Sequence, residues 1–223
     1  MALLKKFREY VQDARADDTE MWMLPYSTLM LMLVILFIVF YGYSAFNSVE
    51  YEAAIADLAS TKPGSPNGEN LRKEIALARG MQEFINEKQL SEKAEVKMTA
   101  HYIRLKMESP ALFDSGSAAL KFDSFPLLDQ MSGQLKTMEN HVIVEGHTDN
   151  VPIHSEQYNS NWELSASRAF SVIHYFIQKG IGPKRLAAHG FGEFRPAFPN
   201  DEEIGRAKNR RIEITVIRTG TGA

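Results

Sequence analysis

The longest apolar stretch of the chain lies near its N-terminus. Residues 21–49 contain no charged side chain, and the densest part, from Leu29 to Tyr43, is apolar on every helical face. A soluble amphipathic helix would carry a polar stripe there. At a rise of about 1.5 Å per residue, a helix of this length exceeds the roughly 30 Å hydrocarbon core of a bilayer. The pattern therefore predicts a single transmembrane helix over residues 21–46.

Two other interpretations of this stretch are a buried core helix and a cleaved signal peptide. The apolar part of a signal peptide spans only about 7–15 residues behind a short basic head, whereas here a head of mixed charge, residues 1–20, precedes a longer apolar stretch. Four basic residues precede the stretch, and the next one after it is Lys62. The long head and long apolar stretch predict an uncleaved anchor in the cell inner membrane. The positive-inside rule then predicts a cytoplasmic N-terminal tail and a periplasmic C-terminal part.

Residues 47–94 have a mixed pattern that predicts a connecting region. Apolar residues recur within 47–60 as in a short amphipathic helix, although a solvated continuation of the anchor helix fits as well. The sequence TKPGSPNG at 61–68 is typical of a flexible linker. Residues 69–89 predict a charged helical stem with one apolar face, which would serve as a packing helix or a dimer contact.

From residue 95 onwards, short strand patterns alternate with helical ones. This alternation predicts an α+β fold, a two-layer α/β sandwich with helices on one face of a small mixed sheet, over residues 95–218, followed by a short tail at 219–223. The expected helix at 123–138 has Asp123 or Ser124 as its cap, and the helix at 161–180 is closed by Gly180. The other expected elements are a strand pair at 95–107, strands at 141–149, 185–193 and 211–217, and a short helix or loop at 200–211.

Composition and charge exclude several classes of function. Lys plus Arg is 25 and Asp plus Glu is 28, so the net charge of -3 gives no indication of nucleic-acid binding. The chain has no cysteine, which excludes disulfides, cysteine-ligated zinc and thiol catalysis.

Several motifs in the C-terminal region occur together in a recognisable order. They are LFDSGSAAL at 112–120, EGHTDN at 145–150, NWELSASRA at 161–169, GFGEFRP at 190–196 and NRRIEI at 209–214. In this order they resemble the OmpA-like peptidoglycan-binding domain, over residues 95–218. The resemblance implies that the domain binds the diaminopimelate residue of the peptidoglycan stem peptide, which ends in an ammonium group and a carboxylate.

The resemblance assigns a role to one acid and one base. Asp149 would accept hydrogen bonds from the ammonium group, and Arg168 would make a forked pair with the carboxylate, which a lysine cannot imitate. Without the resemblance, Asp149 and Arg168 would be expected to pair with each other and brace a loop to a helix. The other residues that the resemblance places around the pocket are Asn161, Leu164, Asn209 and Arg210, with Thr148 and Gly146 shaping it.

Metal binding and hydrolysis are weakly supported by the sequence. The six histidines show no close pairing at ligand spacing, although His147 and His154 flank one loop. Ser165 would approach Asp149 in such a fold, but no nucleophile elbow or poised base accompanies it. We therefore expect a binding module that has no metal and no cofactor, and not an enzyme.

Two longer strings narrow the resemblance. HTDNVPI, continued by SNWELSASRA, and the membrane segment MWMLPYSTLMLMLVILFIVFY are similar to the flagellar stator subunit MotB and its relatives. This resemblance implies a homodimeric subunit of an ion-driven motor, with a multi-span MotA-like partner and a candidate plug helix at 47–60.

The membrane segment departs from that family at one position. MotB-like stators carry an ion-binding Asp two places after the Tyr of this pattern, and here the position holds Thr28, next to Ser27. A hydroxyl can help to ligate an ion but does not titrate at accessible pH. The simplest expectation is that both hydroxyls hydrogen-bond within the helix or to a neighbouring one. The sequence leaves open a motor subunit with an altered ion site, a non-conducting wall anchor and a protein that only braces the envelope.

Overall fold

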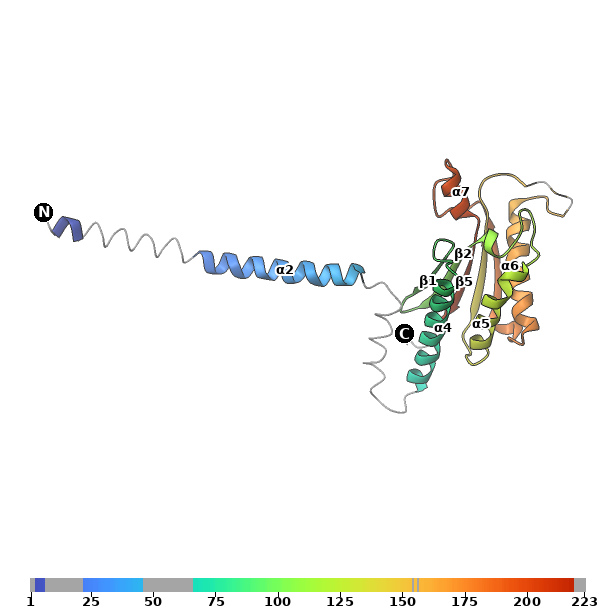
Figure 1. Cartoon of the computed structure of the whole chain (residues 1–223), viewed down its shortest axis with the longest axis horizontal. Helices are drawn as coiled ribbons and strands as arrows, with labels where there is room; N and C mark the ends of the chain where they lie inside the picture. The colour runs from blue at the N-terminus through green and yellow to red at the C-terminus, as the bar shows by residue number, and fades with distance from the viewer. Residues whose placement is uncertain (1–2, 7–21, 46–65, 154, 156, 219–223) are drawn as a thin grey trace. The chain divides into compact units, whose positions relative to one another are not determined.

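The computed structural model describes residues 3–6, 22–45, 66–153, 155 and 157–218. The chain divides into two units, residues 1–46 and 47–223, which are shown in Figure 1 and described separately. The expected plug helix and the first five residues of the expected linker lie outside the described residues.

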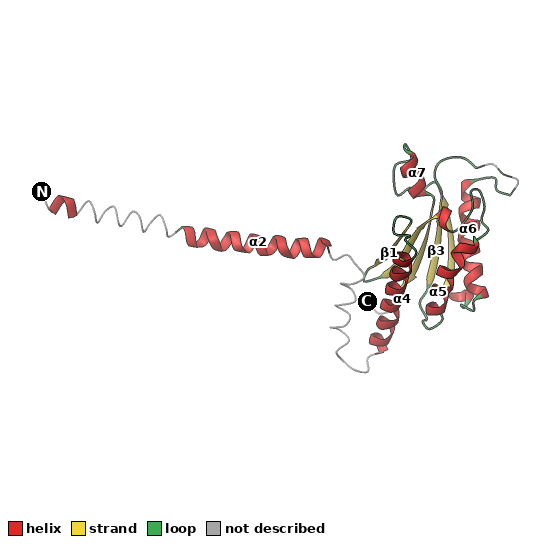
Figure 2. Ribbon diagram, in the orientation of Figure 1, coloured by secondary structure: helices red, strands yellow, loops and turns green. Residues whose placement is uncertain are grey.

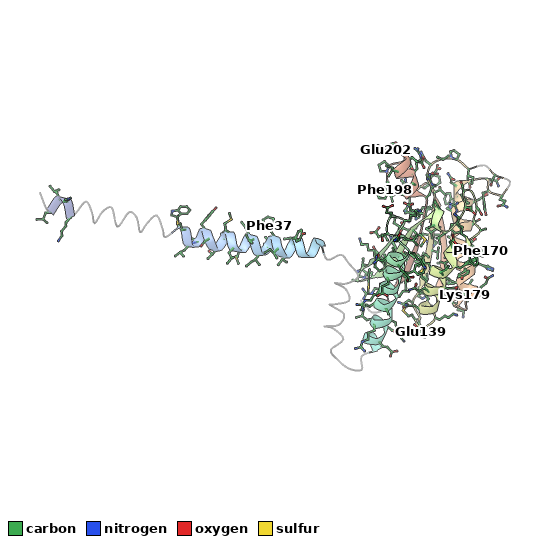
Figure 3. All side chains as sticks on the ribbon, in the orientation of Figure 1. Phe37, Glu139, Phe170, Lys179, Phe198 and Glu202 are labelled. Carbon is green, nitrogen blue, oxygen red and sulfur yellow. The ribbon has the colours of Figure 1, made fainter. Side chains whose placement is uncertain are left out.

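The first unit contains one long helix, α2, at Met23–Ala45. Its segment Met23–Tyr41 is long and apolar enough to cross a membrane, as the charge-free pattern predicted. Large apolar side chains such as Phe37 project from it and are more than half exposed within the protein (Figure 3). An apolar surface of this kind is stable only if lipid or another apolar partner covers it.

The second unit is built on a five-stranded mixed sheet in the order β1-β2-β5-β3-β4. Neighbouring strands are antiparallel, except that β3 and β4 are parallel and are connected through helix α6. The strands are β1 at Ala94–Met98, β2 at Tyr102–Glu108, β3 at Val142–His147, β4 at Leu186–Gly192 and β5 at Arg211–Ile217. Every strand that the sequence predicted is present.

Three helices pack on the sheet and form the second layer (Figure 2). They are α4 at Pro66–Glu87, α5 at Phe125–Leu135 and α6 at Asn161–Gln178. Alternate residues of the central strands point into this layer, because side chains alternate between the two faces of a strand. Fully buried core side chains include Leu77, Met81 and Ile85 of α4, Leu128, Met131 and Leu135 of α5, Phe176 of α6, and Ile103, Val144 and Ile212 of the sheet.

Helix α4 packs with the domain instead of standing apart as a stem. Its buried Glu74 forms an ion pair with Arg218 at 3.0 Å and accepts a hydrogen bond from the side chain of Asn140 at 2.7 Å. The helix begins at Pro66, inside the expected linker, because proline is well tolerated in the first turn of a helix. It closes at Gln89, which has a φ of 54°.

Ser124, one of the two residues expected to cap the helix at 123–138, stands at the N-cap position of α5 but makes no capping bond with its side chain. A short 3-10 helix, Phe122–Ser124, runs directly into α5, so Ser124 has a helical backbone and caps nothing with its side chain. Its hydroxyl donates to the carbonyl of Lys121 at 2.6 Å instead. In contrast, α6 begins at a standard cap, since the Ser160 side chain accepts from the backbone N–H of Glu163.

The segment at 200–211, expected as a short helix or loop, contains helix α7 at Glu203–Asn209. Figure 1 shows α7 at the same end of the sheet as the loop that follows β3. Because α7 leads straight into β5, it brings the residues at this junction next to that loop.

Candidate functional site

The candidate site lies where β3 ends and α6 begins. Helix α6 lies directly on the strands here because two glycines leave room for it. A Cβ at Gly146 would be 2.1 Å from the carbonyl oxygen of Ser165, and one at Gly190 would be 2.5 Å from the backbone nitrogen of Ala166. The Ser165 hydroxyl accepts from the backbone N–H of Gly192 at 2.9 Å and fixes the contact.

One face of α6 points into a cavity of about 710 Å³. Asn161, Leu164 and Arg168 line it, at a spacing that puts them on the same side of a helix. The opposite walls come from the loop after β3, with Thr148 and Asp149, from the segment 109–121, and from Arg210 at the start of β5.

Asp149 supplies the buried acid of the cavity. Its side chain is only 8% exposed, and Oδ2 accepts a hydrogen bond from Nη1 of Arg210 at 2.6 Å. The other guanidinium nitrogen of Arg210 donates to Glu203 of α7 at 2.8 Å. Oδ1 of Asp149 accepts only a long bond, 3.3 Å, from the backbone N–H of Val151. Asp149 therefore keeps acceptor capacity toward the cavity.

Arg168 supplies the buried base. It is 5% exposed and donates through Nε to the carbonyl of Ser117 at 2.8 Å and through Nη2 to the carbonyl of Asp114 at 3.2 Å. Its guanidinium also lies over the ring of Phe113, with 5.4 Å between the charge and the ring centroid. Within the described part of the chain it forms no ion pair with a carboxylate, and burial lowers the pKa of its guanidinium.

Asp149 and Arg168 are thus brought to one cavity but do not pair with each other. The alternative of a direct structural ion pair is wrong. Asp149 pairs with Arg210, and Arg168 donates to backbone carbonyls. The cavity presents a buried negative group and a buried positive group that are both accessible to a ligand. Such an arrangement is complementary to a zwitterion.

Three further predicted residues also belong to this site. Asn161 is buried and donates to the backbone carbonyl of Val151 at 2.9 Å and to the carboxylate of Glu193 at 3.0 Å. The hydroxyl of Thr148 donates to the backbone carbonyl of Asp149 at 2.9 Å, which shapes the loop. Leu164 supplies an apolar wall.

Asn209 lies outside the cavity lining. It is fully buried, and its side-chain amide accepts from the backbone N–H groups of Ala197 and Phe198 and donates to Phe198 and Asn200. These bonds use the amide completely to hold the loop at 197–200 in place. Its role in this structure is to support the site and not to line it.

The sequence did not identify two contributors to the site. Glu203 holds Arg210 from the side opposite Asp149, and it lies in a stretch that read only as a short helix or loop. The segment 112–120 was noted as a motif, but its backbone carbonyls, which hold Arg168, carry no signal in the side-chain pattern.

One of the possible metal ligands and the possible nucleophile are held by other contacts. Among the described residues, Glu145, His147 and Glu213 bring ligand atoms within 4.8 Å of one another. The Glu213 carboxylate, however, binds Arg211 at 2.7 Å and Arg104 at 3.0 Å, so its charge is already neutralised. His154, the other histidine of that loop, lies outside the described residues.

His147 and Ser165 have roles in packing. Burial, and after it the positive charge of Arg211, lowers the pKa of His147 to about 4, so the imidazole is neutral near pH 7. The hydroxyl of Ser165 donates to the carbonyl of Trp162 at 2.9 Å while it accepts from Gly192. With both of these bonds made, Ser165 is not poised as a nucleophile.

In helix α2 the two hydroxyls hydrogen-bond within the helix, as expected. Ser27 donates to the carbonyl of Leu24 and Thr28 to the carbonyl of Pro25, both at 2.9 Å. No acidic residue occurs between Glu20 and Glu50 in the sequence.

Two family models match parts of the chain. Residues 112–210 match the OmpA family, and residues 5–61 match the family described as membrane MotB of the proton-channel complex MotA/MotB. The chain is 27% identical over 256 residues to motility protein B of Bacillus subtilis, covering 98% of this chain and 97% of that protein.

Two solved structures resemble the second unit. A MotB-like protein from Desulfovibrio vulgaris aligns with a TM-score of 0.59 and 28% identity, over 69% of this chain and 99% of that one. The cell wall anchor of the type VI secretion system from Pseudomonas aeruginosa aligns with a TM-score of 0.57 and 31% identity, over 62% of this chain and 96% of that one. The chain is therefore a MotB-like, membrane-anchored protein whose C-terminal domain belongs to the OmpA family.

Proposed function

We propose that this chain anchors a MotA/MotB-type inner-membrane complex to peptidoglycan. One observation carries the proposal: a buried acid, Asp149, and a buried base, Arg168, line the same cavity without pairing with each other. Leaving a buried guanidinium without a carboxylate is costly in a folded protein, and an anionic ligand would offset that cost. The domain acts by binding and performs no catalysis.

The ligand that fits this pair is the diaminopimelate residue of the stem peptide. Its ammonium group donates to Asp149, and its carboxylate accepts a forked pair from the N–H groups of Nη1 and Nη2 of Arg168 that donate to no backbone carbonyl. Thr148 and Asn161 hold the acidic loop, Leu164 packs against the methylene chain of the ligand, and Arg210 holds Asp149 in place. Asn209 supports the loop behind them.

The topology follows from the charge pattern around α2. Residues 1–20 form a cytoplasmic tail, residues 21–46 span the inner membrane once, and the C-terminal domain lies in the periplasm. Residues 47–94 connect the two, residues 95–218 carry the wall-binding domain, and 219–223 form a tail. The subunit assembles as a homodimer with a multi-span MotA-like partner.

Binding to isolated cell walls tests the proposal. Wild-type full chain in detergent is expected to sediment with purified peptidoglycan, and Asp149→Ala and Arg168→Ala are each expected to remove most of this binding. Asp123→Ala, an exposed acid outside the cavity, is the control and retains binding. Unfolding curves verify that the variants are folded. Unchanged sedimentation of both cavity variants means that the pocket is assigned wrongly.

At the membrane, this chain supplies no titrating group to an ion path. A carboxylate in a transmembrane helix is normally retained only for such work, and the hydroxyls of Ser27 and Thr28 are both bound to carbonyls of their own helix. A non-conducting anchor is consistent with this.

Ion flux through the reconstituted complex tests that statement. The complex with wild-type chain is expected to conduct no ions, and Thr28→Asp is expected to introduce flux, with Ser44→Asp as a control at the far end of the helix. Flux through the wild-type complex that is lost on Thr28→Val would contradict the assignment.

A further inference from the structure

Two aromatic side chains form an exposed pair beside the candidate site. Trp162 is 57% exposed and Phe194 is 67% exposed, and their ring centroids are 5.5 Å apart with the planes tilted by 52°. Isolated exposed aromatics are ordinary on protein surfaces. Two in contact form an apolar patch whose exposure to water is unfavourable. We refer to Trp162 and Phe194 as the aromatic pair.

The aromatic pair is held on rigid backbone. Trp162 is the second residue of α6, and the adjoining turn passes so close that a Cβ at Gly192 would lie 3.2 Å from its backbone nitrogen. Gly192 has a φ of 52°, which favours glycine, and its N–H is bound by Ser165. Phe194 closes the same turn through a bond from its N–H to the carbonyl of Phe191 at 3.1 Å. The two rings are therefore presented in a fixed place.

The residues that precede Trp162 and Phe194 in the chain are hydrogen-bonded to each other, and one of them lines the cavity. Asn161 lines the cavity and donates to the carboxylate of Glu193 at 3.0 Å. Trp162 follows Asn161 in the chain and Phe194 follows Glu193. Trp162 on α6 and Phe194 in the turn after β4 therefore each adjoin one of the two residues joined by this bond.

The chemistry of the proposed ligand requires a sugar close to this place. A stem peptide hangs from a glycan strand, and three extended residues span only about 10 Å, which is comparable with the 10–12 Å width of a helix. Sugar rings carry C–H faces that pack on aromatic rings, while their hydroxyl groups bond to neighbouring polar groups such as the Glu193 carboxylate. An amphipathic ligand of this kind suits a large exposed indole ring with polar neighbours.

We propose that the aromatic pair is a binding site for the glycan strand of peptidoglycan, separate from the cavity that holds the stem peptide. The proposal rests on the proposed function, since it is the peptide in the cavity that brings the sugar to the pair. It predicts that the domain binds two parts of the same polymer, the stem peptide and the glycan strand.

Calorimetric titration of the full chain in detergent tests this with two ligands. One is the free stem tripeptide containing diaminopimelate, and the other is the same tripeptide attached to its disaccharide. We expect wild-type chain to bind the disaccharide form about tenfold more tightly, which corresponds to about 1.4 kcal/mol. Trp162→Ala is expected to remove this gain and to leave tripeptide affinity unchanged, whereas Trp162→Phe keeps part of the gain.

Phe170→Ala is the matched control, because Phe170 is a 60% exposed aromatic on the outer surface of the same helix (Figure 3). It is expected to retain the full gain. Equal affinity of wild-type chain for the two ligands, or a gain that survives Trp162→Ala, overturns the proposal. A change of oligomeric state on Trp162→Ala also overturns the proposal, because it would show that the aromatic pair is a contact between two copies of the chain. Asp149→Ala distinguishes failure of the peptide site from failure of the glycan site. If this variant binds the tripeptide normally, the proposed function itself is wrong.

Discussion

The guanidinium of Arg168 combines deep burial with incomplete pairing. It is held by two backbone carbonyls, of Ser117 and Asp114, and by the face of Phe113. Carbonyl dipoles orient a positive charge but do not neutralise it, so the guanidinium can still bind an anion. A lysine at this place would lack the planar fork that bonds to the backbone and to a ligand at once.

A second buried group, His147, gives the domain a predictable dependence on pH. Its pKa in the folded domain, about 4, lies below the ordinary value of 6.5, so the unfolded chain binds its proton first as pH falls. The stability linked to the neutral imidazole is fully present above pH 6.5 and is lost as the pH falls from 6.5 to 4, by about 3 kcal/mol. His147→Phe removes this part of the slope. Urea unfolding at several pH values measures it, and identical slopes for variant and wild type would refute it.

At the level of single residues, the sequence located Asp149, Arg168 and Arg210, but not every group that holds them. All three line the cavity, and Arg210 pairs with Asp149. The side chain of Glu203, which holds Arg210, and the backbone carbonyls of the segment 114–117, which hold Arg168, carry no such signal. The resemblance placed Asn209 around the pocket, and a motif match does not distinguish a residue that lines a pocket from one that supports its wall.

At the level of elements, periodicity predicted most of the domain. Strand β2 alternates strictly in both sequence and burial, and β3, β5 and α6 are apolar and buried where the sequence predicted buried elements. The predicted and observed elements differ at their ends, where local hydrogen bonding competes with the apolar pattern. Pro66 begins a helix inside an apparent linker, and a 3-10 turn replaces the expected cap at Ser124. Element ends depend on contacts that apolar spacing does not encode.

The contact between α6 and the sheet is the element-scale feature on which the site depends. Gly146→Ala places a Cβ against the carbonyl of Ser165 and must displace α6, so we expect a loss of about 1–3 kcal/mol of unfolding free energy and weaker peptide binding. Gly133→Ala in α5 is the control, because its Cβ meets nothing within 4 Å and helix propensity favours alanine. Denaturant unfolding of both variants measures this. Equal stabilities of the two variants would contradict the packing argument.

At the scale of the whole molecule, the two units divide the chemistry between them. The unit with α2 offers an apolar surface and two internally bonded hydroxyls, while the second unit holds all the buried charges of the site. The relative from Bacillus subtilis aligns along nearly the full length of both. A chain built in this way is suited to holding a membrane complex at one end and the cell wall at the other.

The central claim is that the cavity recognises a zwitterion through Asp149 and Arg168. Its most direct test is calorimetric titration of the full chain in detergent with two stem tripeptides that differ only in the third residue, diaminopimelate or lysine. Lysine offers the ammonium group but lacks the second carboxylate. We expect the diaminopimelate peptide to bind at least about tenfold more tightly, and Arg168→Ala to abolish the difference. Equal binding of the two peptides by the wild-type chain would contradict the account.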